Sequence, residues 1–162
     1  MDSLTLSMDA VSAMAVTSSI TMGSADVTFS SGASYRGETK FGLRHGRGIL
    51  RLADGSVFEG TFVGNLAEGE GVLHFPDGSE YRGEVSGGSR HGYGEFVTRA
   101  TPFARYVGEW QHGMRHGQGT LEYDAAGRSS YVGAWERDQR HGRGSLRYAS
   151  GTTYDGDWSC DR

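Results

Sequence analysis

Apolar and polar positions alternate with a period of two along most of the chain. In the stretch YVGEWQHGMRHGQGTLEY, residues 106–123, Tyr106 and Trp110 share one face of a first strand, and Leu121 and Tyr123 share one face of a second. This follows because successive side chains of a β-strand point to opposite faces. A helix is disfavoured, since each internal glycine costs a helix about 1 kcal/mol. The pattern therefore predicts a β-hairpin.

The same hairpin pattern recurs along the chain every 23 to 25 residues. Each unit starts with an aromatic residue followed two positions later by glycine; these starts are Tyr35, Phe58, Tyr81, Tyr106, Tyr131 and Tyr154. Self-similarity at such a period indicates a repeat array. The sequence therefore predicts an all-β fold, a single-layer, elongated antiparallel meander of tandem β-hairpins. About twelve strands at a spacing of about 4.8 Å would give a sheet roughly 55 Å long.

The predicted array covers residues 26–162. It consists of half a unit at 26–34, five full units over 35–153 and half a unit at 154–162. The two longer units carry their extra residues in TRATPFAR and DAAGRSS, which are rich in turn formers, so we expect these insertions between hairpins. The last strand lacks a partner after it, and an unpaired edge invites end-to-end assembly or a homodimer; alternatively, the chain is a shortened form.

The N-terminal segment, residues 1–25, lies outside the repeats. Leu4, Met8, Val11 and Ala15 recur at helical spacing, which would give one apolar stripe. The hydroxyl-rich stretch TSSITMGSAD behind them instead favours a flexible tail. We expect a flexible or partly helical segment that either covers the array or reaches for a partner. It lacks the pattern of a secretory signal, and no run in the chain reaches 18 apolar residues.

Composition narrows the classes of function. Glycine accounts for 27 of 162 residues and hydrophobic residues for only 36%, which disfavours a thick core, while eight Tyr, seven Phe and three Trp argue against a disordered linker. The net charge of −4, with basic residues interspersed among acidic ones, argues against a nucleic-acid partner. A single cysteine, Cys160, is typical of a reducing compartment, so we expect a cytoplasmic protein.

The units resemble the MORN (membrane occupation and recognition nexus) repeat, whose pattern is Y-x-G-x-W-x-x-G-x-x-H-G-x-G. The segment YVGEWQHGMRHGQG matches this pattern throughout, whereas Thr39, Phe62 and Val85 replace the usual tryptophan and Glu68 replaces the histidine. The resemblance implies a non-catalytic scaffold or adaptor in cytoskeletal, ciliary or membrane-contact structures. Its leading setting is a ciliary or flagellar axoneme, such as a radial-spoke head. MORN repeats also accompany some enzymes, including lipid kinases and histone methyltransferases, so a regulatory region of a larger enzyme is an alternative.

Four histidines in identical surroundings, His45, His91, His116 and His141, raise the question of a metal site. Equivalent positions in adjacent hairpins would lie about 9 to 10 Å apart, whereas two histidine nitrogens on one zinc ion lie within about 4 Å of each other. We therefore expect no metal site. We interpret the RHG tripeptides as hairpin corners, where the histidines cap the turns through hydrogen bonds to the backbone.

The Gly-x-Gly pairs also have two interpretations. The pairs are Gly46 and Gly48, Gly69 and Gly71, Gly92 and Gly94, Gly117 and Gly119, and Gly142 and Gly144. A phosphate-binding loop requires a helix after the glycines, but here a strand follows. We expect instead that the glycines let an aromatic ring of a neighbouring strand lie flat on the backbone. No cofactor is expected, and no catalytic residue is assigned.

An arginine precedes four of the turn positions. Arg44, Arg90, Arg115 and Arg140 would form a column that could bind anions, such as anionic lipid headgroups or an acidic partner. The alternative, which the net negative charge favours, is pairing with nearby acids such as Glu38, Glu84 and Glu109.

The aromatic face is the main candidate for partner binding. In a two-layer domain a second layer would cover such a face, and the chain supplies no pattern for one. We expect a shallow groove that accepts an amphipathic helix or extended peptide of another protein, although packing of rings on glycines could bury much of it. The predicted groove residues are Tyr81, Phe96, Tyr106, Trp110, Leu121, Tyr123, Tyr131, Trp135, Leu146, Tyr148, Tyr154 and Trp158.

Overall fold

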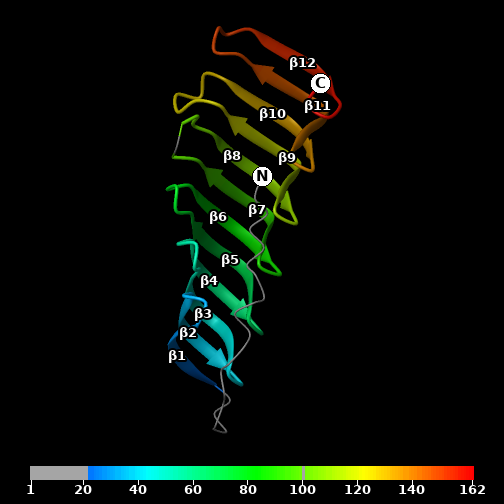
Figure 1. Cartoon of the computed structure of the whole chain (residues 1–162). Coiled ribbons are helices and arrows are strands. Elements are labelled where there is room, and N and C mark those ends of the chain that lie inside the picture. The colour runs from blue at the N-terminus through cyan, green and yellow to red at the C-terminus, as the bar shows by residue number, and fades with distance from the viewer. Residues whose placement is uncertain (1–21, 100) are drawn as a thin grey trace.

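The protein is a single antiparallel sheet of strands stacked in chain order. The structure is a computed structural model that describes residues 22–99 and 101–162, and Figure 1 shows its strands following one another along the long axis. The strands are β1 (Met22–Thr28), β2 (Ser34–Lys40), β3 (Leu43–Arg51), β4 (Val57–Val63), β5 (Leu66–His74), β6 (Glu80–Ser86), β7 (Ser89–Val97), β8 (Arg105–Gln111), β9 (Met114–Glu122), β10 (Ser130–Glu136), β11 (Gln139–Arg147) and β12 (Thr153–Trp158). The predicted meander is therefore confirmed.

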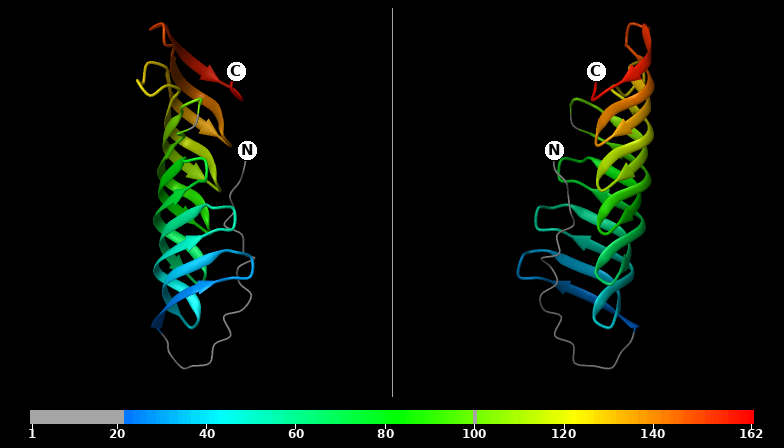
Figure 2. Two further views of the ribbon diagram at one scale, coloured as in Figure 1. Left: turned by 60° about the vertical axis from the view of Figure 1, so that its left-hand side comes forward. Right: turned by 90° about the vertical axis from the view of Figure 1, so that its right-hand side faces the viewer.

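Neighbouring strands pair without any crossover. The order in the 12-stranded sheet is the order in the chain, and every adjacent pair is antiparallel. The ribbon of strands is twisted, so the direction in which the inter-hairpin loops project turns from the β1 end to the β12 end (Figure 2). β1 begins at Met22, upstream of residue 26, where the sequence places the start of the array. The proposed helical stripe of Leu4, Met8, Val11 and Ala15 lies outside the described residues.

Two-residue turns close the five complete hairpins. Both residues of each turn have positive φ, for example 52° and 74° at Phe41 and Gly42, and 50° and 69° at Arg137 and Asp138. Such turns have the twist that antiparallel strands require, but they strain residues other than glycine, asparagine and aspartate. The chain makes the same turn after β12, at Cys160 and Asp161.

Each complete hairpin contains a bulge next to its turn. Between the pairs Gly37–Gly48 and Thr39–Arg44, β2 advances two residues while β3 advances four. Gly46 lies in the bulge with a φ of 64°, a conformation that glycine adopts without strain. The predicted role of the RHG tripeptides as hairpin corners is therefore wrong. They lie inside the second strand, and among the described residues no hydrogen bond joins a side chain of these histidines to a turn.

The insertions of the two longer units lie between hairpins, as predicted. Residues 98–104 connect β7 to β8, and residues 123–129 connect β9 to β10. Strand pairing continues across both connections, because Phe96 pairs with Tyr106 and Leu121 with Tyr131. The longer loops therefore leave the repeat geometry intact.

The core lies on one side of the sheet. We call this side, which carries Tyr35 and the equivalent residues of the other hairpins, the inner face. The ring of Tyr35 lies on two glycines, and a Cβ added at Gly48 would be only 2.5 Å from the ring carbon Cε2. The hydroxyl of Tyr35 donates a hydrogen bond of 2.6 Å to the carbonyl oxygen of Glu38 at the bulge. Tyr81 and Tyr106 repeat this bond. The predicted seat for an aromatic ring is therefore confirmed for the second glycine of each Gly-x-Gly pair, such as Gly48, but not for the first. The first glycine lies in the bulge, and a Cβ added at Gly46 would meet the side chain of Glu38 instead of a ring.

Candidate partner-binding face

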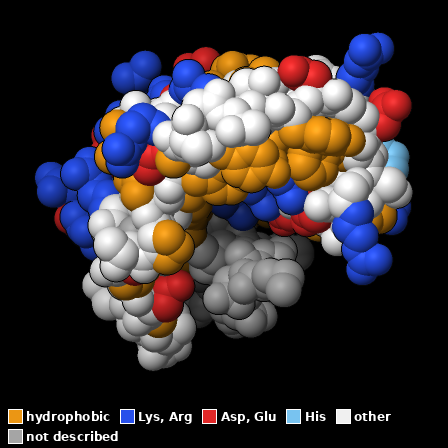
Figure 3. Space-filling model, turned by 90° about the horizontal axis from the view of Figure 1, so that it is seen from above, with side chains coloured by type: hydrophobic (Ala, Val, Ile, Leu, Met, Phe, Trp, Pro, Cys, Tyr) orange, Lys and Arg blue, Asp and Glu red, His pale blue; other side chains and the backbone are white. Residues whose placement is uncertain are grey.

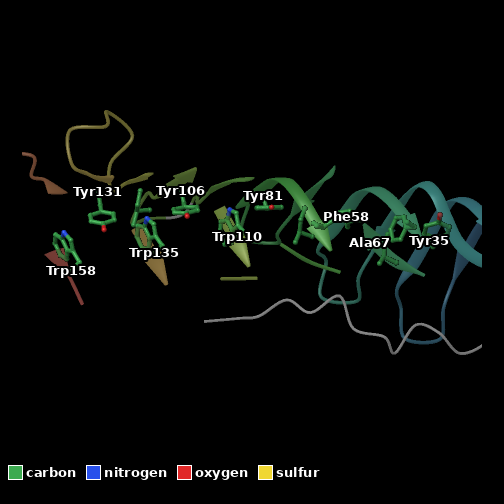
Figure 4. Close-up of a cluster of buried hydrophobic side chains, with 14 of the residues drawn as sticks. Tyr35, Phe58, Ala67, Tyr81, Tyr106, Trp110, Tyr131, Trp135 and Trp158 are labelled. Carbon is green, nitrogen blue, oxygen red and sulfur yellow. The ribbon is translucent and has the colours of Figure 1, made fainter. Parts of the chain in front are cut away.

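Aromatic side chains form a row along the inner face, which we call the aromatic row. Its members are Tyr35, Phe58, Phe62, Tyr81, Tyr106, Trp110, Tyr131, Trp135, Tyr154 and Trp158, and Figure 4 shows most of them in one line along the sheet. Trp135 meets Tyr131 of its own hairpin at 5.1 Å between ring centroids and Tyr106 of the preceding hairpin at 5.4 Å, both edge to face. Each such contact contributes about 0.5–1.5 kcal/mol beyond burial.

Hydrogen bonds reinforce the contacts between hairpins. The indole N–H of Trp110 donates to the carbonyl oxygen of Gly94 at 3.1 Å, and Trp135 makes the equivalent bond to Gly119 at 3.2 Å. Burial raises the pKa of each of the Tyr81 and Tyr106 hydroxyls well above the usual range of tyrosine, although the nearby Arg90 and Arg115 oppose that rise. Both hydroxyls therefore stay protonated and keep donating to the bulge carbonyls.

The predicted arginine column lies on the inner face, where each guanidinium covers an aromatic ring of the next hairpin. The guanidinium carbon of Arg115 lies 4.3 Å from the ring centroid of Trp135, and that of Arg140 lies 4.1 Å from Trp158. Arg90 covers Trp110 at 4.3 Å. These cation–π contacts are stronger where water is excluded.

The same arginines bind the turn of the following hairpin. Nη2 of Arg115 donates to the carbonyl oxygen of Asp138 at 2.7 Å, and its Nε donates to the Asp138 carboxylate at 3.0 Å. Arg140 repeats both bonds with Asp161, each at 3.0 Å. Arg90 donates to the carbonyl oxygen of Gly113 at 2.7 Å, where no carboxylate is available.

Pairing of these arginines with Glu38, Glu84 and Glu109 was expected from the sequence, and the structure shows different partners. The carboxylates of these glutamates accept hydrogen bonds from the backbone N–H groups of Arg47, Tyr93 and Gln118, at 3.1, 2.9 and 2.7 Å. They lie on the opposite side of the sheet, the outer face, because side chains alternate along a strand. Asp138 and Asp161, the actual carboxylate partners, belong to the next turn along.

The carboxylate of Asp161 is stabilised in its ionised form. Burial alone would raise its pKa, but the backbone and side-chain hydrogen bonds from Arg140, together with the charge of that residue, lower the pKa below its usual value. The side chain of Asp161 is 46% exposed, so the ion pair is partly screened by water.

Most of the predicted groove residues are covered by their own neighbours. Eight of the twelve are buried: Tyr81, Tyr106, Trp110, Leu121, Tyr131, Trp135, Leu146 and Trp158. Phe96 is half-buried and packs edge to face on Phe75 at 5.7 Å. Tyr123, Tyr148 and Tyr154 are exposed, at 37%, 48% and 46%. The structure places all twelve on the inner face, but only these last four offer appreciable surface.

The exposed tyrosines gather toward the β12 end of the sheet. Tyr123 and Tyr148 follow β9 and β11 at equivalent positions, and Tyr154 lies in β12 opposite Leu146. Figure 3, which views the molecule from that end, shows hydrophobic side chains along the inner side of the curved ribbon. All twelve strands belong to one sheet, so no second layer covers this face within residues 22–99 and 101–162.

A family model for the MORN repeat matches residues 35–57, 58–80, 81–98, 106–125 and 131–153. The chain belongs to the MORN repeat family. Each match begins at the first aromatic residue of a hairpin, so the MORN units and the structural hairpins coincide. Among curated proteins, none matches the chain significantly. MORN repeats are typically non-catalytic and are consistent with a scaffold that mediates protein interactions or associates with membranes.

Two further findings concern the described part of this MORN array. No three His, Cys, Asp or Glu side chains in residues 22–99 and 101–162 come together as a set that could hold a metal ion. Within those same residues, no helix has the length and apolar character needed to cross a bilayer.

Sequence reasoning missed Asp138 and Asp161 as partners of the arginine column. The available signal was the pair of acidic residues at the second turn position of the last two turns, 23 and 21 residues after Arg115 and Arg140. In a MORN array this separation corresponds to one repeat, so the partners are neighbours in adjacent hairpins.

Proposed function

We propose that the protein is a scaffold that holds an amphipathic helix or an extended peptide of another protein against the inner face. The observation that carries this proposal is the exposure of Tyr154 at the end of the aromatic row and of Tyr123 and Tyr148 beside it. They lie on a sheet face without a second layer in the described residues. Tyrosine is favoured at interfaces because its ring is apolar while its hydroxyl tolerates water.

The partner would contact the exposed edge of the inner face rather than the tryptophans. Trp110, Trp135 and Trp158 are buried between tyrosines and arginines, so they lie beneath the surface that a partner would contact. A partner with apolar side chains at helical or alternating spacing would cover Tyr148 and Tyr154, which remain about half exposed.

Pull-down from lysate with identification of the captured proteins tests this proposal. We expect one or more partners to be lost when Tyr123 and Tyr148 are replaced together by serine. Tyr93→Ser is the matched control, because Tyr93 is 59% exposed but lies on the outer face. Equal loss of partners in both variants, or no loss in the double variant, would contradict partner binding at the inner face.

The cellular setting we propose rests on the family. MORN repeat proteins are often associated with the cytoskeleton or with membranes. Among such settings we favour a cytoskeletal assembly, with a ciliary or flagellar axoneme and a radial-spoke head as the leading case. Imaging of a tagged copy in ciliated cells tests this: signal along the axoneme supports the proposal, and uniform signal or signal at the plasma membrane contradicts it.

Recognition of anionic lipids through the arginine column has less support from the geometry. The guanidinium groups of Arg90, Arg115 and Arg140 already stack on aromatic rings and donate to turn carbonyls. A lipid phosphate would have to displace these contacts. Sedimentation with vesicles containing phosphatidylserine would favour the lipid function only if binding fell in Arg90→Gln and Arg115→Gln variants.

End-to-end assembly is a further part of the proposal on partners. β12 pairs with β11 on one side only, so its other edge presents backbone donors and acceptors. We propose that this edge can pair with a second chain. Sedimentation velocity over a range of concentrations tests it; a monomer at all concentrations would contradict it.

A further inference from the structure

We propose that a pocket beside Arg44 binds a carboxylate group, supplied by an aspartate or glutamate side chain of the partner peptide. That the carboxylate belongs to a partner protein rests on the proposed function. The carboxylate site itself rests on the geometry around Arg44. The pocket lies toward the β1 end of the inner face, between β3 and β5, with Leu50, Phe62, Ala67 and Gly88 in its lining.

The pocket lies where two adjacent repeats depart from the pattern of the others. Ala67 occupies the position that Arg44, Arg90, Arg115 and Arg140 hold in the remaining hairpins, and Val85 occupies the position of Trp110. Two small side chains thus replace an arginine and the tryptophan that it would cover. The aromatic row is interrupted at Val85, and the pocket lies next to this interruption.

Arg44 is buried at this pocket with unsatisfied donors. Its residue exposure is only 6%, and its Nη2 donates to the carbonyl oxygen of Asn65 at 2.8 Å. Its Nε and Nη1 are buried, and neither has a hydrogen-bond partner among the described residues. Buried polar groups in proteins are almost always hydrogen-bonded, so two unsatisfied donors on one cation indicate a missing acceptor.

Two of the equivalent arginines, Arg115 and Arg140, show which acceptor is missing. Nε of Arg115 donates to the carboxylate of Asp138 at 3.0 Å, and the backbone N–H of Arg115 donates to the same oxygen at 2.9 Å. Asn65 stands at the corresponding turn position beside Arg44. Its side-chain oxygen accepts the backbone N–H of Arg44 at 2.9 Å, but Nε of Arg44 is left without it.

The pocket therefore carries a positive charge that no carboxylate pairs with among the described residues; the guanidinium contacts only the carbonyl oxygen of Asn65 and the rings of Tyr35 and Phe62. Burial lowers the pKa of Arg44, with Tyr35 opposing that change, but an arginine stays protonated at physiological pH. The nearest candidate carboxylate in the sequence, Glu38, binds the backbone N–H of Arg47 on the outer face. A buried charge without a partner costs free energy. An incoming anion would pair with Arg44 as Asp138 pairs with Arg115 and Asp161 with Arg140.

A carboxylate is the anion of choice here because the equivalent Nε donors of Arg115 and Arg140 are bonded to the carboxylates of Asp138 and Asp161. The apolar lining from Leu50 and Phe62 favours a carboxylate carried on a side chain with apolar neighbours. The expected partner therefore presents an acidic residue flanked by apolar residues. Such a residue would fix where the peptide begins along the array, with its remainder extending toward Tyr123 and Tyr148.

The arginine Nε–H signals of the full chain, followed by two-dimensional ¹H–¹⁵N NMR during addition of sodium acetate, test the site without a partner. Arg44→Lys identifies the Arg44 signal, and sodium chloride at matched ionic strength is the control. We expect acetate, but not chloride, to shift the Arg44 signal saturably in the millimolar range. The signals of Arg115 and Arg140 should not move, because the Nε groups of these arginines already donate to aspartate carboxylates.

Two reciprocal variants sharpen the experiment. Asn65→Asp should abolish the response of Arg44 to acetate, because the new carboxylate would accept the Nε–H of Arg44 as Asp138 accepts that of Arg115. Asp138→Asn should create a response at Arg115. Arg44 behaving alike in acetate and chloride, an unchanged response in Asn65→Asp, or no response in Asp138→Asn would overturn the proposal.

A last arm separates the two sources of the carboxylate. If the Arg44 signal of the acetate-free chain moves when Asp2 and Asp9 are both replaced by asparagine, the carboxylate comes from the chain itself, and the assignment to a partner is overturned. An unmoved signal supports the partner. Failure of the Tyr123 and Tyr148 pull-down alongside a positive acetate response would reject the proposed partner surface while the Arg44 site stands.

Discussion

At the scale of single residues, the fold depends on how closely tyrosine rings approach bare backbone. Gly94 illustrates this: a Cβ at that position would lie 2.6 Å from two ring carbons of Tyr81. The ring cannot move away easily, because it is fully buried and its hydroxyl is bonded to the carbonyl oxygen of Glu84. Glycine is therefore required at such positions for steric reasons rather than for flexibility.

Gly94→Ala should lower the free energy of unfolding by about 3 kcal/mol, because the added methyl group overpacks a rigid site. Gly113→Ala is the comparison, since Gly113 has a φ of 81° and open space around its Cβ direction. That variant should cost only about 1 kcal/mol of backbone strain. Urea unfolding monitored by circular dichroism gives both values. A loss at Gly94 no larger than that at Gly113 would refute the steric role.

At the scale of the element, four of the five complete hairpins are connected to the next by an arginine that reaches across to its turn. The exception is the hairpin of β4 and β5, where Ala67 takes that position. Arg140 and Asp161 form such a connection between β11 and the turn after β12. The connection joins residues that are distant in sequence, so single-hairpin reasoning could not reveal it. The sequence does predict the hairpins themselves, since strand alternation and glycine-containing turns are local signals.

The Asp161 connection should weaken in acid. Its carboxyl has a lowered pKa in the folded state, so its contribution to stability is complete above the unfolded pKa of about 3.9 and disappears as the pH falls through the folded value. Asp161→Asn should therefore melt below the parent protein at pH 6, and the difference should shrink toward pH 2. Thermal melts between pH 2 and 7 measure it. A difference that is constant across this range would contradict the ion pair.

At the scale of the whole molecule, the array is a one-dimensional stack in which each hairpin contacts only its neighbours. The sequence predicts this architecture because repeats of one length must stack in one way. It does not predict how much of the inner face is accessible. Trp135 is buried because an adjacent hairpin presents Tyr106 and Arg115 to it, and these contacts depend on register and curvature. The exposed part of the candidate site was therefore smaller than predicted.

A stack of this kind should be most stable in its middle. β1 has no buried residue, whereas β8 contains Tyr106, Gly108 and Trp110 in buried positions. Hydrogen–deuterium exchange followed by mass spectrometry should show β1 exchanging much faster than β8, with protection rising from the ends inward. Uniform protection from β1 to β12 would indicate a globally cooperative unit instead.

Edge-to-face contacts between aromatic rings of successive hairpins stabilise the stack of hairpins. A double-mutant cycle on Tyr106 and Trp135, each replaced by leucine, tests this stabilisation most directly, since these rings meet at 5.4 Å across adjacent hairpins. Urea unfolding should give a coupling free energy of about 1 kcal/mol. A control cycle on Tyr106 and Trp158, whose rings do not meet, should be additive within about 0.5 kcal/mol. Additivity in the Tyr106 and Trp135 cycle would contradict the account.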